Sequence, residues 1–529
     1  MKNLLSHKYS HWLLTVAFGL AVFVFWRYRY PFALVYQEQF QLFLFGDDYF
    51  LSRVAEPGGL ARYVAEFIVQ FYNSIMIGSV ILAVVFMLLQ QLTWRLMVSS
   101  HHSPLTTPLY PLSFVPAILL WYAMGDESVL LTYTVSLLLA LSAIWAYPKH
   151  RYARWAFLIV GIPVLYWMTG PMVLLVAACM VPLPLAAVGL VYGLACILLT
   201  AHIVPFPLDQ LLLGLSYYRF PMMLPYMLVV IPVLICLLRH VSAIMGTAPM
   251  IQFSKKMVSR RTVPVIAVAV ALLACLLIPQ GFDAKKYELI EYDYLVRLKD
   301  WQGIIAKAEK QSPDLPMSVS ATNLALAMTN QLGERAFDFY QRTSEGLLPP
   351  FERNFATTQL TGEIYYHLGL VNTAQRFAFE AMEAIPNYNK SGRVVKRLAE
   401  TNLINGEYDV ARKYLQMLEK TIFYRPWAQR TMALLGHEDQ INAHPLYGWL
   451  RKCRLTDDFL FSDQEIDKIC GQLVMHNPQN LMAVQYLVMA PLLDGDAQRF
   501  INYVSYVQSQ VNYNPRYVRE AIAKIRRGR

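Results

Sequence analysis

The sequence predicts an all-α protein with two parts, a polytopic transmembrane helix bundle over residues 1–281 and a helical repeat domain over residues 282–529. Long apolar runs continue to about Ile278 and then give way to mixed, charge-rich sequence. After Phe282, apolar residues recur every three to four positions and no strand alternation persists. Small residues and prolines in this second part repeat with a period of about 34 residues, as in stacked helix pairs.

About nine membrane spans are predicted from hydropathy. We place them at residues 12–28, 73–92, 109–124, 129–147, 155–169, 171–183, 185–201, 222–238 and 263–279. Four prolines interrupt the apolar run between 155 and 203, where neighbouring helices would have to satisfy the freed backbone groups. A basic start, an apolar run and then Arg27 in place of a small-residue cleavage site predict a retained first span.

Charge predicts the orientation of these spans. The acidic residues before position 283 all fall in alternate connecting segments: Glu38, Asp47, Asp48, Glu56, Glu66, Asp126, Glu127 and Asp209. The other connecting segments carry only positive charge: Lys2, Lys8, Arg95, Lys149, Arg151, Arg154, Arg239, Lys255, Lys256, Arg260 and Arg261. Because basic segments stay in the cytoplasm, we expect a bacterial inner-membrane protein with a cytoplasmic N-terminus and a periplasmic C-terminal domain.

The formal net charge of +10 belongs mostly to the membrane part, which has 16 Lys and Arg against 8 Asp and Glu. The expected partner of this charge is the lipid bilayer surface. Nucleic acid is not an expected partner, because the second part has no basic patch interleaved with aromatic residues. Cys453 and Cys470 lie in the predicted outward-facing part. The sequence allows either a disulfide between them or two free thiols.

No cofactor is predicted. Neither a CxxC nor an HExxH spacing occurs, and the histidines do not cluster, so the sequence indicates no metal site; it also does not exclude a divalent cation. No phosphate-binding glycine loop is present, so nucleotide hydrolysis is not indicated.

The longest outward-facing connection, from about Tyr30 to Tyr72, carries an acidic pair and an amphipathic helix. Gly46-Asp47-Asp48-Tyr49 lies about twenty residues after the first span. After a turn at Glu56-Pro57-Gly58-Gly59, apolar and polar residues separate onto two faces at helical spacing, with Leu60, Val64, Phe67, Ile68 and Phe71 on one face and Arg62, Glu66 and Gln70 on the other. Such a helix is expected to lie in the membrane interface.

The second part resembles the tetratricopeptide family over at least residues 295–425. Gly369, Ala374, Ala378, Ala381 and Pro386 match the small-residue positions and terminal proline of one unit. The corresponding turn positions are Lys299, Gly333, Gly369 and Gly406, with a fainter unit near Asp494-Gly495-Asp496. The resemblance implies a curved stack of helix pairs with a concave binding surface.

The membrane part resembles glycosyltransferases of the GT-C architecture, through its topology and through Gly46-Asp47-Asp48-Tyr49 in the first outer loop. The resemblance implies a polyprenyl-phosphate-linked sugar as donor and an acidic residue in the first outer loop at the site of transfer. The chain as a whole is also similar to an uncharacterised family of bacterial membrane proteins with the same two-part layout.

Chemistry that fits this resemblance can be assigned to residues. Glycosyl transfer needs a carboxylate to accept the proton of the acceptor and cations to stabilise the departing phosphate. Asp47, Asp48 and Asp209 are the candidate catalytic carboxylates. Arg53, Arg62 and Arg219 are the candidate contacts for the donor phosphate, because arginine binds phosphate in a bidentate manner.

Four of these residues, Asp47, Asp48, Arg53 and Arg62, also have a purely structural interpretation. Asp47 and Asp48 could simply begin a short helix from Tyr49 to Val54. Arg53 and Arg62 could pair with Glu56 and Glu66, and Arg62 with Glu66 has the i, i+4 spacing of a helical ion pair. The acids Asp126 and Glu127 are expected to lie at a solvated loop tip.

Two functions are therefore expected, and the sequence leaves both open. The first is a membrane glycosyltransferase or oligosaccharyltransferase that uses a polyprenyl-phosphate-linked sugar, with a protein or glycan acceptor in the repeat groove. The alternative is a non-enzymatic membrane scaffold whose repeats bind a protein partner in envelope assembly or export. Convergence of Asp47, Asp48, Asp209 and Arg219 on one cavity would favour the enzyme.

Overall fold

The structure is a computed structural model that describes residues 2–98, 107–245, 262–349, 355–386, 389–455 and 465–527. Over these residues the secondary structure is helical, with one isolated backbone bridge between Val129 and Tyr218. The chain forms two compact units, Met1–Ala284 and Lys285–Arg529, which we call the membrane unit and the C-terminal unit. The predicted all-α class is confirmed.

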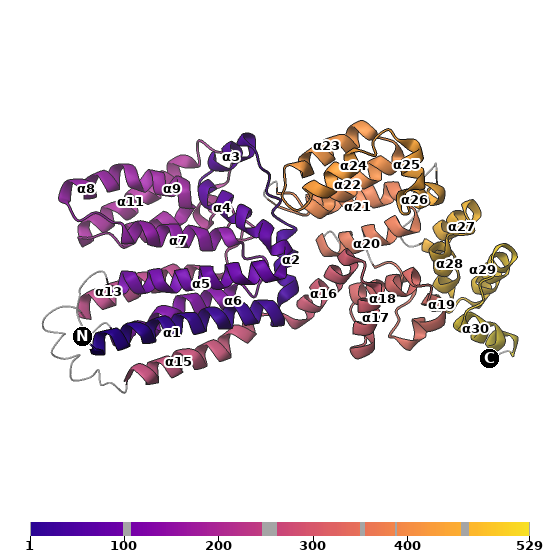
Figure 1. Cartoon of the computed structure of the whole chain (residues 1–529), viewed down its shortest axis with the longest axis horizontal. Coiled ribbons are helices and arrows are strands. Elements are labelled where there is room, and N and C mark those ends of the chain that lie inside the picture. The colour runs from indigo at the N-terminus through magenta and orange to yellow at the C-terminus, as the bar shows by residue number, and fades with distance from the viewer. Residues whose placement is uncertain are drawn as a thin grey trace. The chain divides into compact units, whose positions relative to one another are not determined.

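The membrane unit is a bundle of apolar helices joined by short interfacial ones. Its elements are α1 (Lys2–Val24), η1 (Phe25–Arg29), α2 (Pro31–Glu38), α3 (Asp47–Val54), α4 (Gly59–Val69), η2 (Gln70–Asn73), α5 (Ile75–Val98), η3 (Thr107–Phe114), α6 (Val115–Ala123), α7 (Leu131–Trp145), α8 (Arg151–Ala156), η4 (Phe157–Gly161), α9 (Ile162–Thr169), η5 (Gly170–Met172), α10 (Val173–Ala178), α11 (Leu183–Thr200), α12 (Leu208–Leu213), α13 (Tyr226–Met245), α15 (Thr262–Leu277) and η6 (Ile278–Gly281). Figure 1 shows α1, α5, α13 and α15 extending along a common direction.

Six helices among the described residues are long and apolar enough to cross a membrane. They are His11–Arg29, Ile75–Val98, Arg151–Ala178, Leu183–Thr200, Tyr226–Ile244 and Pro264–Gly281. Two shorter apolar helices, Leu109–Ala123 and Leu131–Trp145, accompany them. The chain is therefore a membrane protein, and the number of about nine crossings stays a prediction.

The helical stretch from Arg151 to Ala178 reverses its direction at Gly170. Gly170 has a φ of 66°, and Pro171 follows it. Residues before and after this point contact the same glycines of α11. Leu158 and Ala177 both lie beside Gly189, and Ile162 and Leu174 both lie beside Gly193. The helices α9 and α10 thus run in opposite directions, and the break falls where a boundary between spans is predicted.

A buried cluster of neutral polar side chains joins α1, α5 and η3. Thr15 Oγ1 donates a hydrogen bond to Gln90 Oε1 at 2.9 Å, and Gln90 Nε2 donates to Ser113 Oγ at 2.7 Å. Gln91 Nε2 donates to Thr15 Oγ1 at 2.8 Å, and the Tyr110 hydroxyl lies 2.5 Å from the same oxygen. Since hydrocarbon offers no competing water, such bonds help to hold neighbouring helices together.

Charged residues of the membrane unit gather at its two ends. The acidic residues lie on segments that meet at one end, which we call the acidic end. At the opposite end, the guanidinium groups of Arg95 and Arg154 lie over the rings of Trp145 and Tyr147. The predicted cytoplasmic residues Lys255, Lys256, Arg260 and Arg261, and also His101 and His102, lie outside the described residues.

The C-terminal unit is a succession of short helices, many of which pack as neighbouring pairs. They are α16 (Ala284–Leu298), α17 (Trp301–Lys310), α18 (Pro316–Met328), α19 (Leu332–Arg335), η7 (Ala336–Asp338), η8 (Ser344–Gly346), α20 (Phe355–Leu368), α21 (Val371–Glu383), α22 (Gly392–Asn405), α23 (Tyr408–Glu419), α24 (Arg425–Met432), α25 (Glu438–Ala443), α26 (Tyr447–Cys453), α27 (Ile466–His476), α28 (Leu481–Asp494), α29 (Ala497–Gln510) and α30 (Arg516–Arg526).

A residue with a left-handed backbone separates successive helices at recurring positions of this unit. Within the described residues these are Lys299, Asn330, Gly369, Gly406, Gly436 and Gly495. The turns predicted at Lys299, Gly369 and Gly406 are found there. The turn predicted at Gly333 is wrong, because Asn330 takes the left-handed conformation and Gly333 lies inside α19. Membership of the tetratricopeptide family stays a prediction.

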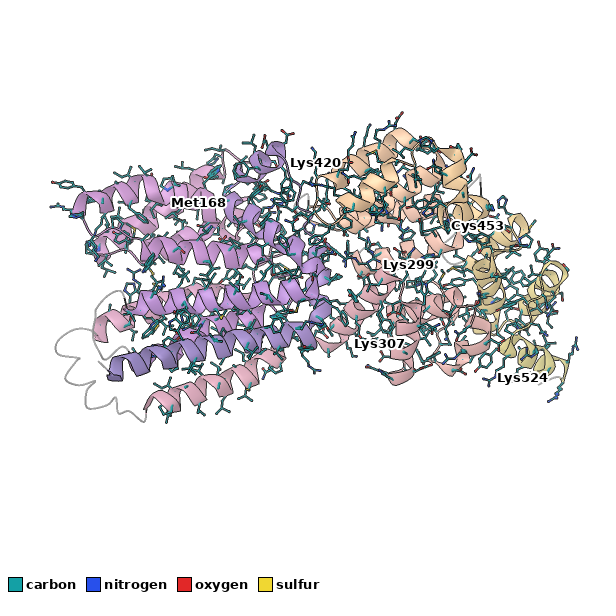
Figure 2. The ribbon with its side chains drawn as sticks, in the orientation of Figure 1. Met168, Lys299, Lys307, Lys420, Cys453 and Lys524 are labelled. Carbon is teal, nitrogen blue, oxygen red and sulfur yellow. The ribbon has the colours of Figure 1, made fainter. Side chains whose placement is uncertain are left out.

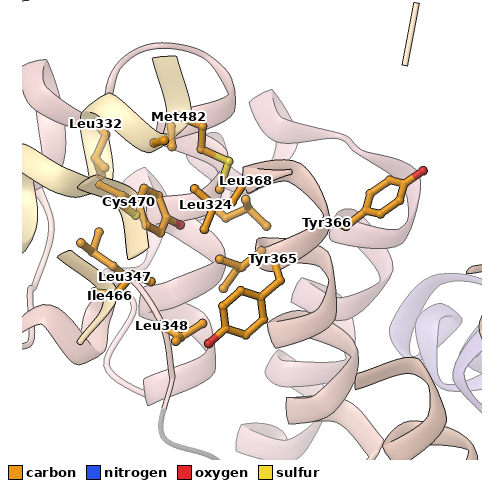
Figure 3. Close-up of a cluster of buried hydrophobic side chains, with 14 of the residues drawn as sticks. Leu324, Leu332, Leu347, Leu348, Tyr365, Tyr366, Leu368, Ile466, Cys470 and Met482 are labelled. Atoms are coloured by element: carbon orange, nitrogen blue, oxygen red, sulfur yellow. The ribbon is translucent and has the colours of Figure 1, made fainter. Parts of the chain in front are cut away.

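A large cluster of buried apolar residues lies in the C-terminal unit. Figure 3 shows Leu324, Leu368 and Met482 gathered within it, while the ring of Tyr366 points away from them. Both Cys453 and Cys470 are buried free thiols. Of the two alternatives left open by the sequence, the structure therefore has the free thiols.

Candidate functional site at the acidic end

Three connecting segments that are distant in sequence meet at the acidic end. Val129, after α6, forms a backbone bridge with Tyr218, which follows α12. Gln37, on α2, donates its side-chain Nε2 to the backbone oxygens of Glu127 and Val129 at 3.2 and 3.3 Å. The segments after α1, α6 and α11 thus form one surface, as expected if they face the same side of a membrane.

Glu66 is the centre of a buried ion-pair network at this end. Its carboxylate is fully buried and accepts hydrogen bonds from Arg53 Nε at 2.8 Å, Arg62 Nε at 3.0 Å and the Tyr49 hydroxyl at 2.5 Å. Arg62 Nη1 also reaches Glu56 Oε2 at 2.6 Å. The predicted helical pair of Arg62 and Glu66 is therefore present.

The network shifts the pKa values of Tyr49 and Arg53. Burial and then the Glu66 carboxylate raise the pKa of Tyr49, so its hydroxyl remains a donor. Burial alone would lower the pKa of Arg53, but Glu66 and Tyr49 outweigh it and the pKa is raised. Arg53 and Arg62 are already paired with carboxylates, so a donor phosphate would have to share or replace those partners.

The amphipathic helix predicted near residues 60–71 exists as α4, and its polar face points into the protein. The buried residues of α4 and its extension include Arg62, Glu66 and Gln70, whereas Phe67 is 37% exposed. On the adjoining α3, Phe50 and Leu51 are also exposed. The outer face of α4 is thus apolar, and its inner face carries charges that are paired within the protein. This arrangement suits a helix that lies against lipid.

Asp47 and Asp48 occupy the first turn of α3 and are exposed. This position is the structural alternative expected for them, because carboxylates in a first turn are favoured by the helix dipole. Gly46 precedes them as the N-cap residue, and neither carboxylate caps the helix through a side-chain hydrogen bond.

Arg219 is buried and lies beside an aromatic ring. Its guanidinium carbon is 3.7 Å from the centre of the Phe40 ring. The neighbouring Tyr218 hydroxyl donates to Asp126 Oδ2 at 2.7 Å. The expectation of a solvated tip is wrong for Glu127, which is 6% exposed, because the segments carrying Gln37 and Tyr218 cover the short turn.

Asp209 lies in the first turn of α12 and is exposed, and the same helix borders an apolar cavity. The cavity measures about 400 Å³ and is lined by Tyr133, Pro171, Met172, Leu174, Leu175, Ala178, Leu212, Leu213, Tyr217, Leu224, Leu228, Val229, Pro232, Val233, Cys236 and Leu237. Leu212 and Leu213 follow Asp209 by three and four residues, so the three share one face of the helix.

Tyr217 and Pro171 form a wall between this cavity and the ion-pair network. On the other side of the wall is a small recess that Glu56 and Arg62 also line. The Tyr217 hydroxyl donates to the backbone oxygen of Thr169 at the reversal between α9 and α10. Of the arginines predicted to contact a phosphate, Arg62 is thus placed next to the cavity wall.

The predicted catalytic residues do not gather around one cavity, so the convergence that would favour an enzyme is not found. Asp47 and Asp48 come from α3 and Asp209 from α12, and the apolar cavity and the recess are lined by none of them, nor by Arg219. Among the described residues, no group of three His, Cys, Asp or Glu side chains could hold a metal ion.

Sequence reasoning missed the centre of the network. The i, i+4 spacing identified Glu66 as a partner of Arg62, but nothing local connected it with Arg53 or with the Tyr49 hydroxyl. The spacing of 13 residues between Arg53 and Glu66 crosses the Glu56-Pro57-Gly58-Gly59 turn. A signal was nevertheless present, because a glutamate on a helix face bordered by lipid requires a partner.

Comparison with known proteins gives a family. A family model described as a family of unknown function (DUF6057) matches residues 6–527. The chain belongs to this family. No curated protein and no solved structure matches it. The match covers both units.

Proposed function

We propose that this DUF6057 member transfers a glycosyl or oligosaccharyl group from a polyprenyl-phosphate carrier to an acceptor on the periplasmic side of a bacterial inner membrane. The observation that carries the proposal is the juxtaposition on α12. One face of this helix bears Leu212 and Leu213, which line the apolar cavity, and Asp209, which is exposed one turn earlier.

The apolar cavity suits a hydrocarbon chain. Apart from two tyrosines, the side chains that line it are aliphatic, proline, methionine or cysteine, and its volume of about 400 Å³ lies in the range of ligand sites. A carrier chain held there would place its phosphate towards the acidic end, beside Tyr217 and the Arg62 recess. Arg62 would then share its charge between Glu56 and the phosphate.

Asp209 is the carboxylate that we assign as general base. It would take the proton of an acceptor hydroxyl or amide as that group bonds to the anomeric carbon of the sugar. The bond from this carbon to the phosphate oxygen breaks in the same step, and the polyprenyl phosphate departs with the electron pair. Asp47 and Asp48 would then act only at the start of α3, while Arg53 belongs to the ion-pair network and Arg219 packs against Phe40.

A second candidate is a membrane scaffold whose C-terminal unit binds an envelope protein. The specific observation in its favour is the Glu66 network, which accounts for Arg53 and Arg62 by internal pairing without a substrate. In that case the acidic end is a structural device, and the C-terminal unit carries the function.

The test is an analysis of polyprenyl-linked glycans in cells that lack the chain. Deletion should cause the unused donor to accumulate, and wild-type chain should restore the normal level. Asp209→Asn should leave the donor high, because loss of a general base lowers the transfer rate by about 10²- to 10⁴-fold.

The matched control is Asp409→Asn on the C-terminal unit, where the Asp409 side chain is 91% exposed. It should restore the normal level as well as wild type does. Normal glycan levels in the deletion strain would contradict the proposed transfer, and full rescue by Asp209→Asn would remove Asp209 from the mechanism.

A further inference from the structure

A cavity of about 460 Å³ lies within the C-terminal unit, apart from the site described above. It is lined by Lys299, Ala327, Met328, Asn330, His367, Leu446, Trp449, Leu450, Gln479, Asn480, Leu481 and Met482. These residues come from the end of α18 and the turns after α16 and α18, from α20, and from the starts of α26 and α28 with the residues just before them. The volume is that of a small-molecule site.

Lys299 is an unexpected residue at its position. It is one of the left-handed turn residues, and the others in the described C-terminal unit are glycine or asparagine, which tolerate this backbone best. Lys299 has a φ of 57°, a backbone conformation that is unfavourable for a residue with a long side chain. Strained residues of this kind concentrate at binding sites. Lys299 is labelled in Figure 2.

The ammonium group of Lys299 has no ion pair or hydrogen bond to any described residue. The Lys299 side chain is exposed as a whole, at the mouth of the cavity. Partial desolvation there lowers its pKa, and the carboxylates of Glu363 and Glu400 oppose this effect. No aspartate or glutamate lines the cavity. The cavity therefore offers one positive charge that nothing in its wall neutralises.

Backbone groups add to this preference for negative charge. The cavity includes the first residues of α28, a helix of 14 residues. The N–H groups of Leu481 and Met482 have no hydrogen-bond acceptor among the described residues, as is usual for a first helical turn. The N-terminus of a helix favours an anion.

His367 supplies an independent sign of a ligand. It is 8% exposed and lines the cavity, and its Nε2 atom has no hydrogen-bond partner among the described residues. Glu363 Oε2 is 3.7 Å away, beyond hydrogen-bond distance. Burial lowers the pKa of His367 to about 3, so the ring is neutral and can exchange one hydrogen bond with a ligand.

We propose that this cavity binds a uronic acid residue of an acidic glycan, with the sugar carboxylate between Lys299 and the start of α28. One ammonium matches the single charge of a carboxylate, whereas a phosphate dianion would be left half compensated. Trp449 and the adjoining Leu446 and Leu450 offer an apolar wall for the C–H face of a sugar ring, and Gln479 offers a side-chain amide for its hydroxyls.

The choice of a glycan over a peptide rests on the proposed function, in which the acceptor is bound outside the membrane unit. Binding and transfer can still fail separately, because binding is measured on purified chain without any donor. The proposed site thus deepens the transferase proposal without depending on Asp209.

The test is calorimetric titration of the full chain in detergent with digalacturonate, cellobiose, trialanine and inorganic phosphate as separate probes. Digalacturonate should bind, and the neutral cellobiose should bind at least 10-fold more weakly. Lys299→Asn keeps a residue that tolerates the left-handed turn and removes the ammonium, so it should weaken digalacturonate binding by about 10- to 100-fold.

Lys310→Asn, at an exposed lysine of α17, is the matched control and should bind digalacturonate like wild type. Lys299→Gly should also lose binding while its thermal midpoint stays equal to or above that of wild type, which separates a binding role from a structural one. Equal binding of digalacturonate and cellobiose, unchanged affinity in Lys299→Asn, or tighter binding of trialanine or phosphate would overturn the proposal.

Discussion

The Glu66 network gives the sharpest prediction of stability. Replacing Glu66 by glutamine should destabilise the membrane unit strongly, because Arg53 and Arg62, which are 11% and 4% exposed, would lose the carboxylate that both contact. Breaking a buried ion pair by removing one partner typically costs about 3–5 kcal/mol. For a domain of 150–250 residues, about 2–4 °C is lost per kcal/mol, so the thermal midpoint should fall on the order of 10 °C.

The assay is thermal unfolding of the full chain in detergent, followed by tryptophan fluorescence. Trp167 is a suitable probe because its Nε1 donates to the backbone oxygen of Val54, at the end of α3. Glu56→Gln is the matched control. Glu56 is 22% exposed and its ion pair is with Arg62, so its loss should cost about 1 kcal/mol or less.

A double variant tests the reason for the loss. Adding Arg53→Gln to Glu66→Gln removes one uncompensated charge and should recover part of the thermal midpoint, as expected for residues in one network. Equal shifts for Glu66→Gln and Glu56→Gln, or no recovery in the double variant, would refute the account of a buried network centred on Glu66.

Four further predictions concern the two units. Gly369→Val should lower the thermal midpoint of the C-terminal unit more than Gly406→Val, because both glycines are left-handed but a Cβ at Gly369 would lie 2.7 Å from Cys453 Cβ and one at Gly406 would meet nothing within 4 Å; equal losses would contradict this. Stability of the C-terminal unit should decline as the pH falls from about 6.5 towards 3, because the unfolded chain protonates His367 near 6.5 and the buried ring resists protonation down to about 3; His367→Gln should flatten that slope in denaturant titrations, and an unaltered slope would count against it. Asp47→Asn and Asp48→Asn should both sustain normal polyprenyl-linked glycan levels if these acids only begin α3, whereas a defect in one of them would return it to the catalytic role expected from the first outer loop. Alkaline phosphatase fused after Arg529 should be active, because the basic residues before α15 are predicted to stay in the cytoplasm, and an inactive fusion would reverse the topology.

The sequence predicted elements that depend on local patterns. Hydropathy located the apolar helices, and the predicted boundary between the spans 155–169 and 171–183 falls at the reversal between α9 and α10. Period and composition also placed turns at Lys299, Gly369 and Gly406, where the structure has a left-handed backbone. These features follow from residues that are close in sequence, so a single chain is enough to show them.

Features that depend on distant segments were not predictable in this way. Glu127 was expected in solvent, but the segments carrying Gln37 and Tyr218 bury it. The turn expected at Gly333 is formed by Asn330, because asparagine also tolerates the left-handed backbone and a glycine pattern cannot tell the two apart. At Gly406, no atom lies within 4 Å of the position that a Cβ atom would take. Glycine is therefore needed at position 406 only for its left-handed backbone conformation.

The candidate site shows the same division. Residue type and membrane side singled out the acids and arginines of the acidic end, and local spacing identified the Arg62–Glu66 pair. The link between Asp209 and the apolar cavity needed the structure, because the cavity is formed by α7, α10, α12 and α13 together. The same holds for Lys299, whose turn position was visible in the sequence while its cavity was not.

The central claim is that the apolar cavity of the membrane unit holds a polyprenyl phosphate. Native mass spectrometry of the chain purified from membranes and incubated with polyprenyl phosphate tests it directly. Leu213→Trp should fill the cavity, and Leu199→Trp, on the 65% exposed Leu199 of α11, is the control. The account predicts bound carrier on wild type and Leu199→Trp and at least 10-fold less on Leu213→Trp. Equal occupancy of all three, or no bound carrier on wild type, would contradict it.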